Sequence, residues 1–562
     1  MYHGIITEAD MKFELKILPS CEKCFVDESI QDKKGVESLS MLKNERLNFQ
    51  VAYTMEETEI HIREMRLEID SPIGEYITVS RVDQVPVSFA TYTHTDKRGY
   101  LRTTPGLYPD LLIPMDVQSR LVMVNNSLGT LMLTVECADG IAAGDYPITV
   151  RAFDGEDVAA EATANVHVVD AVLPESELIH TQWFHADCLA QYYDVPVFSE
   201  RHWELIENFA REAVLEGVNM ILTPVVTPPL DTARGGERLT VQLVDIAVNG
   251  GEYSFGYDKL DRWIETMDRV GMKYFEICHL YTQWGAEHAP KVMATVDGEY
   301  KRIFGWETDA HGEEYRTFIR AFIKSLLEHL KALRVDERCW YHISDEPSFD
   351  HLESYRGARE AISDLLEGYP IIDALSSYEL YKTGAVKNPI PGTDHAHKFI
   401  ENGVENLWTY YCCSEHSRVS NRFIAMHGAR TRMLGTQLFK YDIVGFLQWG
   451  FNFYNCKLSR YPINPFSDTC AEFSFPGGDS FAVYPGPGGR PYRSLHGVLF
   501  TEALTDLRAF KLCASLIGKE ETMRLIEEDS ETPITFFDYP ISTDYTVSMR
   551  EKINRAIESS VK

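Results

Sequence analysis

The sequence predicts a multidomain protein of the β plus α/β class, with an N-terminal β-sandwich followed by a (β/α)8 TIM-like barrel. At 562 residues, the chain is too long for one ordinary domain. Residues 1–172 contain short strand-like runs separated by turn residues, a pattern typical of a sandwich. From residue 178 onward, strand-like and helix-like runs alternate, which is typical of a parallel α/β fold.

The first domain, residues 1–172, is predicted to contain strands only. Each predicted strand is a short alternating or apolar run bounded by Gly, Pro, Asn or Asp. These runs are 13–17, 47–53, 60–69, 121–124, 129–137, 146–153 and 162–169. The segment Leu173-Pro174-Glu175-Ser176 is the expected linker to the second domain.

The second domain, residues 178–520, is predicted to be the catalytic barrel, because eight strands with helices between them match a (β/α)8 fold. The predicted strands are 179–184, 219–223, 273–280, 339–344, 371–376, 385–390, 406–412 and 443–449. The predicted helices are 202–216, 259–270, 314–333, 352–366, 421–433 and 494–516. An open doubly wound sheet is the competing fold, but no Gly-rich phosphate loop follows the first strand. Residues 464–493 form a long Gly- and Pro-rich loop of the kind that is often functional, and residues 521–562 are expected to be a tail packing on the barrel.

Charge and hydropathy exclude several classes of partner. The formal net charge of −31 argues against a nucleic acid and against an anionic membrane surface. No apolar run is long enough to span a membrane, and the first 20 residues lack the features of a secretory signal. We therefore expect a cytoplasmic protein with reduced thiols.

The cysteines do not indicate a metal or a cofactor. Cys21 and Cys24 form a CxxC pair, but no second pair stands at the spacing that zinc requires. Cys412 and Cys413 are expected to pack within a strand. The sequence therefore predicts no metal site and no cofactor.

The segment Trp340–Pro347 places two adjacent carboxylates, Asp345 and Glu346, where an apolar strand ends. Pro347 cannot continue a strand ladder and favours an extended backbone before it. The C-terminal ends of barrel strands are where active sites are built. Two neighbouring carboxylates with separated pKa values suit acid/base chemistry, although a solvated turn before a helix would have the same sequence.

Aromatic and amide side chains follow the other predicted strands and would surround this pair. Such a set matches sugar recognition, because rings stack on apolar sugar faces and polar groups bond the hydroxyls. Trp183 and Trp408 would equally suit the interior of a barrel. The candidate substrate-binding residues are Trp183, His185, His279, Tyr281, Tyr378, Trp408, Tyr410, Tyr411, Gln448, Trp449 and Asn452.

Adjacent residues do not easily flank a sugar ring from opposite sides. An ordinary glycosidase needs two carboxylates about 5–9.5 Å apart across the scissile bond. A substrate-assisted route fits better, in which one carboxylate is the general acid and the other holds a 2-acetamido group that acts as the nucleophile. Neighbouring strand residues point to opposite faces, so the strand must break for both to enter one site.

With these residues, the chain resembles glycoside hydrolase family 123, the β-N-acetylgalactosaminidases, and related glycosidase-like proteins. The motifs are Ser344–Pro347, Pro105–Asp110, Gln448–Asn452 and Gly478–Gly486. The resemblance implies a β-sandwich, a (β/α)8 barrel and retaining, substrate-assisted removal of terminal β-GalNAc from oligosaccharides. It implies that Asp345 orients the acetamido N–H and that Glu346 is the general acid/base. A tyrosine is also expected to hold the acetamido group, with Tyr281, Tyr378, Tyr410 and Tyr411 as candidates.

Other functions remain open at this stage. The barrel could be a non-catalytic sugar-binding protein, although an intact Asp-Glu pair favours an enzyme. The chain could be a β-hexosaminidase or a glycosidase of another specificity. A distant second carboxylate, such as Glu276 or Glu415, would instead support the ordinary two-carboxylate mechanism.

Overall fold

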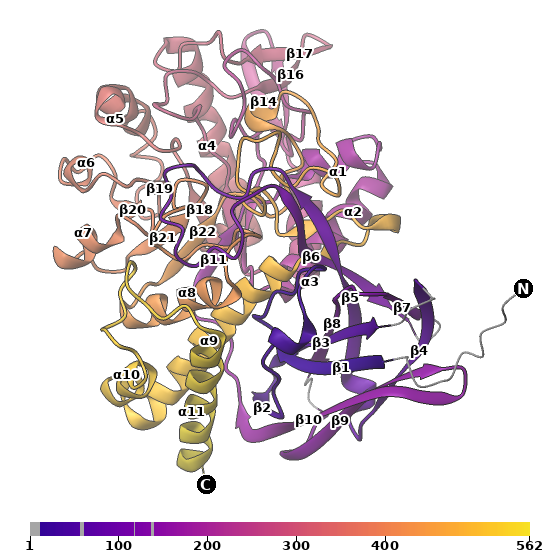
Figure 1. Cartoon of the computed structure of the whole chain (residues 1–562). Helices are drawn as coiled ribbons and strands as arrows, with labels where there is room; N and C mark the ends of the chain where they lie inside the picture. Colours follow the sequence, from indigo (N-terminus) through magenta and orange to yellow (C-terminus); the bar gives the residue numbers. More distant parts are fainter. Residues whose placement is uncertain (1–11, 57–60, 117–118, 137–139, 562) are drawn as a thin grey trace, which may run out of the picture.

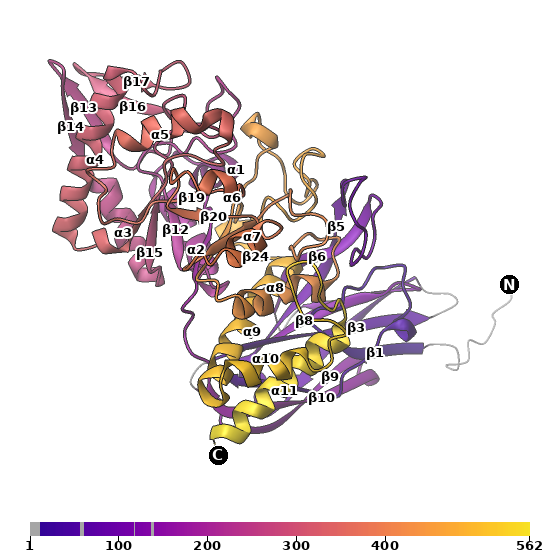
Figure 2. The same cartoon turned by 90° about the vertical axis from the view of Figure 1, so that its left-hand side faces the viewer.

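The computed structural model describes residues 12–56, 61–116, 119–136 and 140–561. Figure 1 shows a β-rich N-terminal region beside a larger α/β region, as the sequence predicts. The last helices of the chain lie between the two, which is also visible in the turned view of Figure 2. Ile60 and Cys137, at the ends of two predicted strands, fall outside the described residues.

The N-terminal region consists of two five-stranded sheets that enclose one hydrophobic core. The first has the order β1-β3-β8-β5-β6 and is antiparallel throughout. The second has the order β2-β10-β9-β4-β7, with one parallel pair between β2 and β10. The core contains Val51 and Leu133 of the first sheet with Val150 and Val166 of the second. The strands are β1 (Lys12–Pro19), β2 (Ser38–Lys43), β3 (Arg46–Glu56), β4 (Ile62–Asp70), β5 (Ile77–Val87), β6 (Gly106–Met115), β7 (Arg120–Val124), β8 (Gly129–Glu136), β9 (Gly144–Asp154) and β10 (Asp157–Val172).

Each of the seven runs predicted in this region corresponds to a strand, whereas β2, β5 and β6 were not predicted. The unpredicted β6 contains Pro109, Pro114 and Gly106, residues that disfavour a strand when judged locally. It is an edge strand of its sheet, where a missing N–H is tolerated.

All eight strands predicted in the second region are present and lie in two sheets. Parallel pairs give the first the order β18-β15-β12-β11-β22-β21, and β19 pairs with β20 in the second. Single bridges, Tyr341 to Ile371 and Gly392 to Tyr410, connect the two sheets. The described residues therefore form two parallel sheets, and a regular closed (β/α)8 barrel stays a prediction. The strands are β11 (Ile179–Gln182), β12 (Met220–Thr223), β15 (Tyr274–Ile277), β18 (Cys339–Tyr341), β19 (Ile372–Ala374), β20 (Asn388–Ile390), β21 (Trp408–Tyr411) and β22 (Gly445–Gln448).

Helices follow the strands of these sheets. Ser199 caps the first long helix by accepting a hydrogen bond from the His202 N–H, and Gly271, at φ 93°, ends the next. The helices are α1 (Ala186–Tyr192), α2 (Glu200–Leu215), α3 (Asp258–Val270), α4 (Glu313–Leu333), α5 (Leu352–Glu360), α6 (Tyr378–Tyr381), α7 (Ala396–Glu401), α8 (Gly428–Lys440), α9 (Leu495–Ile517), α10 (Lys519–Glu527) and α11 (Thr543–Val561). Among the described residues, none of these helices combines the length and apolar character of a membrane span.

The prediction of a helix over 421–433 is wrong in its position, because α8 begins only at Gly428. Tertiary hydrogen bonds hold the preceding residues in an irregular conformation. The Asn421 amide donates to the carbonyls of Cys412 and Glu415, and the buried Arg422 guanidinium donates to Gln182. The predicted helix over 352–366 is also too long, since α5 ends at Glu360.

A further sheet, of four strands, was not predicted. Its order is β14-β13-β16-β17, and it is built from the loops that follow β12 and β15. Figures 1 and 2 show it at the outer end of the α/β region. Its strands are β13 (Asp245–Asn249), β14 (Glu252–Gly256), β16 (Val292–Val296) and β17 (Glu299–Phe304). The late loop adds the short pair β23 (Val483–Tyr484) and β24 (Tyr492–Arg493).

The predicted tail, residues 521–562, contains α11, which packs on α8 and α9 and also on β2 and β10. Arg550 of this helix bonds Glu45 of the β-rich region at 2.6 Å and Asp506 of α9 at 3.0 Å. All three charged side chains are buried, so removing one of them would leave an unpaired charge and destabilise the fold. The C-terminal helix therefore connects the two regions.

Asp110 forms a second buried connection between the regions. Its carboxylate accepts hydrogen bonds from the Tyr484 hydroxyl at 2.6 Å and from the His496 N–H at 3.1 Å. Burial alone would raise the pKa of Asp110, but His496 and Tyr484 lower it below its ordinary value. This contact joins two of the sequence motifs, Pro105–Asp110 and Gly478–Gly486, and its role is structural.

Candidate active site

An open cavity with an empty volume of about 900 Å³ lies at the C-terminal ends of the parallel strands. This edge is where α/β folds build their sites, because the loops that follow the strands converge there. The lining residues come from strand ends and from loops far apart in sequence. They are Trp183, His185, Leu230, Asp231, Gln283, Trp284, Asp345, Glu346, Ala374, Tyr410, Cys412, Cys413, Ser414, Leu447, Trp449, Lys457 and Phe475.

Asp345 and Glu346 both line this cavity because β18 breaks before it reaches them. The strand ends at Tyr341, and Glu346 has a φ of 44°, a left-handed conformation that is rare for a residue with a side chain. The Trp284 N–H donates to the Asp345 carbonyl at 2.9 Å and holds the break in place. Backbone strain of this kind is common at functional sites.

The two carboxyl groups have different surroundings. Asp345 is half-buried, whereas Glu346 is exposed to the cavity. Burial, and then the neighbouring charge of Glu346, raise the pKa of Asp345 well above its ordinary value. The Tyr410 hydroxyl donates a 2.6 Å hydrogen bond to Oε1 of Glu346. Burial and the charge of Glu346 raise the pKa of Tyr410 well above its ordinary value, so the phenol remains a donor.

Aromatic rings surround the carboxylates. Trp449 packs against Phe475 with ring centroids 5.1 Å apart, and its Nε1 donates to Asp479 at 3.1 Å. Trp284 is 46% exposed at a φ of 58°. A fixed, exposed indole beside carboxylates gives a sugar an apolar face on which to stack. The cavity can therefore bind a ring that carries both apolar and polar faces.

A polar cluster lies buried among the strands directly behind the cavity, to which Trp183 of the lining connects it. His342 contacts Glu276 through Nε2 at 2.5 Å and Asp373 through Nδ1 at 3.2 Å. Trp183 and Thr181 also donate to the Glu276 carboxylate, and Tyr355 donates to Asp373. Burial by itself lowers the pKa of His342, but its bonds to Asp373 and Glu276 raise it to about 10. The cluster is therefore an imidazolium held between two carboxylates.

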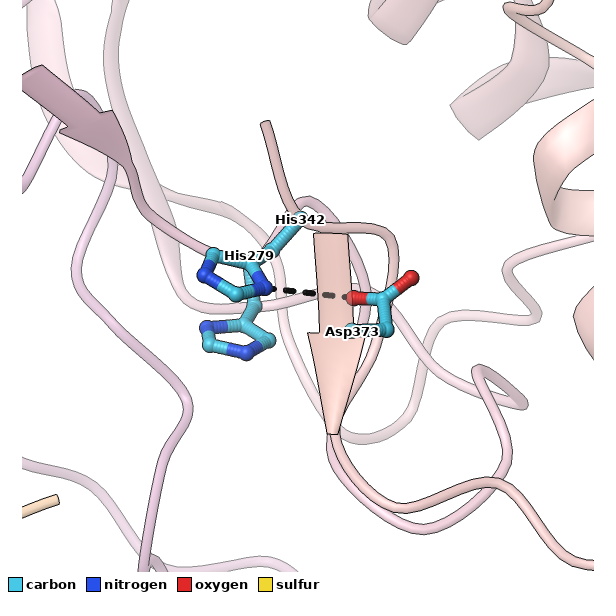
Figure 3. Close-up of side chains that lie close together, drawn as sticks. All are labelled: His279, His342 and Asp373. Carbon is cyan, nitrogen blue, oxygen red and sulfur yellow. Dashed lines mark hydrogen bonds and ion pairs between the residues drawn. The ribbon is translucent and has the colours of Figure 1, made fainter. Parts of the chain in front are cut away.

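Figure 3 shows His279 stacked on His342, beside Asp373. The two rings lie 4.2 Å apart and 14° from parallel. Among the described residues, these three side chains are the one group whose ligand atoms lie close enough for a metal ion. They do not fit one, because both nitrogens of His342 are bonded to carboxylates and a protonated imidazole has no free lone pair.

Four of the eleven predicted substrate-binding residues line the cavity, namely Trp183, His185, Tyr410 and Trp449. Gln448 and Asn452 are buried beside it; the Asn452 amide accepts from the His185 N–H and donates to its carbonyl. Tyr378 lies in a separate surface cavity with Ser376, Lys382 and Lys398. The remaining four are buried outside the lining, and they are His279, Tyr281, Trp408 and Tyr411.

The structure adds lining residues that the sequence did not indicate. Asp231 and Lys457 come from loops more than 200 residues apart, and the Asp231 carboxylate accepts from the Leu458 N–H at 2.9 Å. Leu458 and Ser459 both have positive φ, so this contact holds a strained turn. No local pattern marks these loops. Cys412 and Cys413 line the cavity instead of packing within a strand, because β21 ends at Tyr411.

The distant carboxylates considered from the sequence are not placed to act as nucleophiles. Glu276 is fully buried, and both of its oxygens accept hydrogen bonds. Glu415 is 3% exposed and accepts from the Cys412 N–H at 2.8 Å. Neither lines the cavity.

Comparisons with known proteins identify the family of the α/β region. The family model for "Glycoside hydrolase 123, catalytic domain" matches residues 183–513. A family 123 glycoside hydrolase from Clostridium perfringens, studied for glycolipid glycan hydrolysis, has a similar structure, with a TM-score of 0.73 and 14% identity over 98% of both chains. This likeness shows a shared fold.

Two further solved structures are less similar. A glycosyl hydrolase family 2 member from Bacteroides cellulosilyticus has a TM-score of 0.28 and 9% identity, covering 78% of this chain and 46% of its own. An FMN-binding beta-glucuronidase from Faecalibacterium prausnitzii has a TM-score of 0.35 and 9% identity, covering 83% and 60%. No curated protein matches the chain.

Proposed function

Because the chain belongs to glycoside hydrolase family 123, we propose that it is a retaining exo-β-N-acetylgalactosaminidase that removes terminal β-GalNAc from oligosaccharides. Its nucleophile is the acetamido oxygen of the substrate. The observation that carries the proposal is the pair Asp345 and Glu346, adjacent in sequence and both facing one cavity. Consecutive residues do not easily reach opposite faces of a sugar, which favours substrate assistance over the two-carboxylate mechanism.

In the first step, Glu346 protonates the glycosidic oxygen while the acetamido oxygen attacks the anomeric carbon. The bond to the leaving group breaks, and a cyclic oxazolinium forms. Asp345 accepts a hydrogen bond from the acetamido N–H and opposes the positive charge that develops there. In the second step, Glu346 takes a proton from water, which attacks the anomeric carbon and reopens the ring. Two inversions leave the product with its original β configuration.

The surroundings of the two carboxyl groups support these roles. The exposed Glu346 can exchange its proton with a leaving group and with water. The half-buried Asp345 suits a fixed contact with a bound group. The positive charge that develops on the acetamido nitrogen as the ring closes would offset the burial that raises the pKa of Asp345, and so favour its carboxylate form in the transition state.

Tyr410 is the best candidate for the tyrosine that holds the acetamido group. Of the four tyrosines considered, it alone lines the cavity. Its hydroxyl is already directed at Glu346, 2.6 Å away, and can turn to a bound substrate. Trp183, Trp284 and Trp449 would form the walls against which the sugar stacks.

The proposal extends to the scaffold, the substrate, the cofactor requirement and the location of the protein. The eight parallel strands would act as a (β/α)8-type barrel that presents the strand ends on one rim. The partner would be a glycan with terminal β-GalNAc, and the Clostridium perfringens relative directs attention to the glycans of glycolipids. Catalysis would need no metal or cofactor, and the protein would act in the cytoplasm.

The test compares aryl β-glycosides of GalNAc, GlcNAc and Gal. Turnover is expected for the first, weak turnover for the second and none for the third, because Gal has no acetamido nucleophile. Proton NMR should detect the β-anomer of GalNAc as the first product. A galacto-configured thiazoline, which mimics the cyclised intermediate, should bind far more tightly than GalNAc.

Other outcomes would refute specific parts of the proposal. Comparable turnover of the Gal substrate would rule out the acetamido mechanism. A covalent glycosyl-enzyme trapped on a carboxylate would do the same. Tight binding of GalNAc without hydrolysis of any glycoside would identify a sugar-binding protein on an inactive scaffold.

A further inference from the structure

The accessible thiols of the described chain are concentrated in the candidate active site. Of the ten cysteines that the structure describes, all free, eight are buried and two, Cys412 and Cys413, are partly exposed. These two adjacent residues both line the cavity that contains Glu346. A thiol reagent that enters the cavity therefore meets this pair before any other described cysteine.

The backbone of the pair is held firmly. The Cys412 N–H donates to the Glu415 carboxylate at 2.8 Å, and the Cys412 carbonyl accepts from the Asn421 amide at 2.9 Å. Tyr410, two residues earlier, holds the Glu346 carboxylate. A group attached to either sulfur would consequently stay in the cavity, close to the general acid.

The two thiols differ in chemical character. The Cys412 sulfur is bonded to Ser414, because it donates to the Ser414 hydroxyl and accepts from the Ser414 N–H, each at 3.5 Å. Contact with Cys412 lowers the pKa of Cys413 against burial, with Tyr92 and Lys457 adding to this effect and the charge of Glu346 opposing it. Burial raises the pKa of thiols elsewhere, as in Cys278 and Cys339, to about 12. Since the thiolate is the reactive form and the Cys412 sulfur is already engaged by Ser414, Cys413 is the nucleophile of the pair.

We propose that Cys413 is a modification site at which small-molecule disulfides form a mixed disulfide that blocks the cavity reversibly. The Cys413 sulfur attacks one sulfur of the reagent, a new S–S bond forms, and the other half leaves as a thiolate. One protein thiol is oxidised and one reagent disulfide is reduced. A thiol reductant reverses the exchange, so the block can be removed.

A disulfide between Cys412 and Cys413 themselves is disfavoured by geometry. Adjacent Cα atoms lie about 3.8 Å apart, whereas disulfides usually span about 4.4–6.8 Å. Formation of the vicinal bond would therefore strain the wall of the cavity. A mixed disulfide avoids this strain, which is why a small external disulfide is the expected partner.

The experiment treats the full-length protein with glutathione disulfide and maps the adduct by peptide mass spectrometry. Because Cys137 lies outside the described residues, the background is the Cys137→Ser protein. We expect one glutathionyl group on Cys413, loss of at least nine-tenths of the hydrolysis of the aryl β-GalNAc substrate, and full recovery with dithiothreitol. Excess galacto-thiazoline should slow the modification by tenfold or more.

Three variants sharpen the test, each compared with its own untreated activity. Cys413→Ser should keep its activity during treatment. Cys412→Ala removes the other partly exposed thiol, and Cys413 should still be modified at a similar rate. Cys278→Ser, a substitution of a buried thiol, should leave the modification rate unchanged.

The proposal is overturned if glutathione attaches to another cysteine instead, if Cys413→Ser is inactivated as fast as its parent, or if fully modified protein keeps its activity. The block, unlike the adduct, rests on the proposed function. If no glycoside is hydrolysed, the proposed function fails. In that case, adduct mapping still identifies the modified cysteine. Loss of thiazoline binding by the modified protein still shows whether the adduct blocks the cavity.

Discussion

The carboxylates of the α/β region occupy two contrasting environments. Glu276 and Asp373 are fully buried, and each accepts hydrogen bonds from several donors. Asp345 and Glu346 face the cavity, and among the described residues the side-chain donor bonded to them is Tyr410. His342 bridges the buried pair and balances one of its two charges, whereas no cation of the described chain is bonded to the cavity pair.

This difference separates carboxylates that maintain the fold from those available for chemistry. A buried charge persists when its partners replace the water it has lost, and it then has no free lone pairs for a ligand. A carboxylate in a cavity with few partners can bond a substrate instead. The contrast excludes Glu276 as a nucleophile, because it lies within β15 with both oxygens bonded, whereas Asp345 follows the end of β18.

The largest expected effect concerns the two carboxylates that face the cavity. Glu346→Gln should lower kcat on a natural oligosaccharide by about 10²–10⁴-fold, because protonation of the leaving group is lost. Aryl glycosides with good leaving groups should be partly spared. Glu415→Gln is the matched control, and it should retain most of its activity. Equal losses on both substrate types, or an equal loss in the control, would contradict the assignment of Glu346.

Asp345→Asn should lower kcat by about 10²–10³-fold with a smaller change in KM, because the carboxylate acts mainly on charge that develops in the transition state. An activated leaving group should not rescue this variant. Its affinity for the galacto-thiazoline should also fall most of the way to that for GalNAc. Asp231→Asn changes another carboxylate of the cavity and serves as the control. Rescue of Asp345→Asn by a good leaving group would show that Asp345 is an acid instead.

The free energy of unfolding tests the role of the two buried carboxylates. His342→Gln leaves Glu276 and Asp373 without their cation and should cost about 3–5 kcal/mol of unfolding free energy. The folded pKa of His342 is about 10 and its ordinary value is 6.5. The stabilisation is therefore complete below about pH 6.5 and is lost as the pH rises through 10. Thermal unfolding across this range should show the wild type and the variant converging at high pH.

A gap between the two proteins that stays constant from pH 6.5 to 10 would contradict the imidazolium assignment. Two further side chains contact His342 or the carboxylates that it bridges: the His279 ring stacks on His342, and the Tyr355 hydroxyl donates to Asp373. Tyr355→Phe removes one neutral donor from a buried carboxylate and should cost about 1.5–3 kcal/mol, less than the loss of the cation. The unfolding free energies of the two variants would thereby separate the contribution of the cation from that of a neutral hydrogen-bond donor.

The smallest effect concerns Tyr410, which joins the cavity to the strands. Tyr410→Phe should lower kcat by about 10–100-fold, because a hydrogen bond to a charged group contributes about 1.5–3 kcal/mol. Tyr411→Phe is the control at the next position; its ring is buried against Phe446 and its hydroxyl has no partner among the described residues. Similar losses in the two variants would mean that packing, not the Tyr410 hydroxyl, supports activity.

Much of the organisation could be predicted from the sequence because it depends on local patterns. Apolar runs bounded by turn residues located seven strands of the first region and eight of the second. The charged pair and the proline predicted that this strand ends at Ser344, whereas β18 already ends at Tyr341. The helix over 421–433 failed for the opposite reason, since contacts with distant residues override its local periodicity.

By itself, the sequence determined the β-rich and α/β regions, seven strands of the first region and the eight parallel strands of the second, and the position of Asp345 and Glu346 beyond a strand end. Only the tertiary structure decided which neighbouring side chains face the cavity. Tyr410 lines it and Tyr411 does not, because successive residues of β21 point to opposite sides. Asp231, Trp284, Lys457 and the two cysteines join the site through long-range loop contacts and strand ends. Such placements depend on packing between distant segments, which no local pattern encodes.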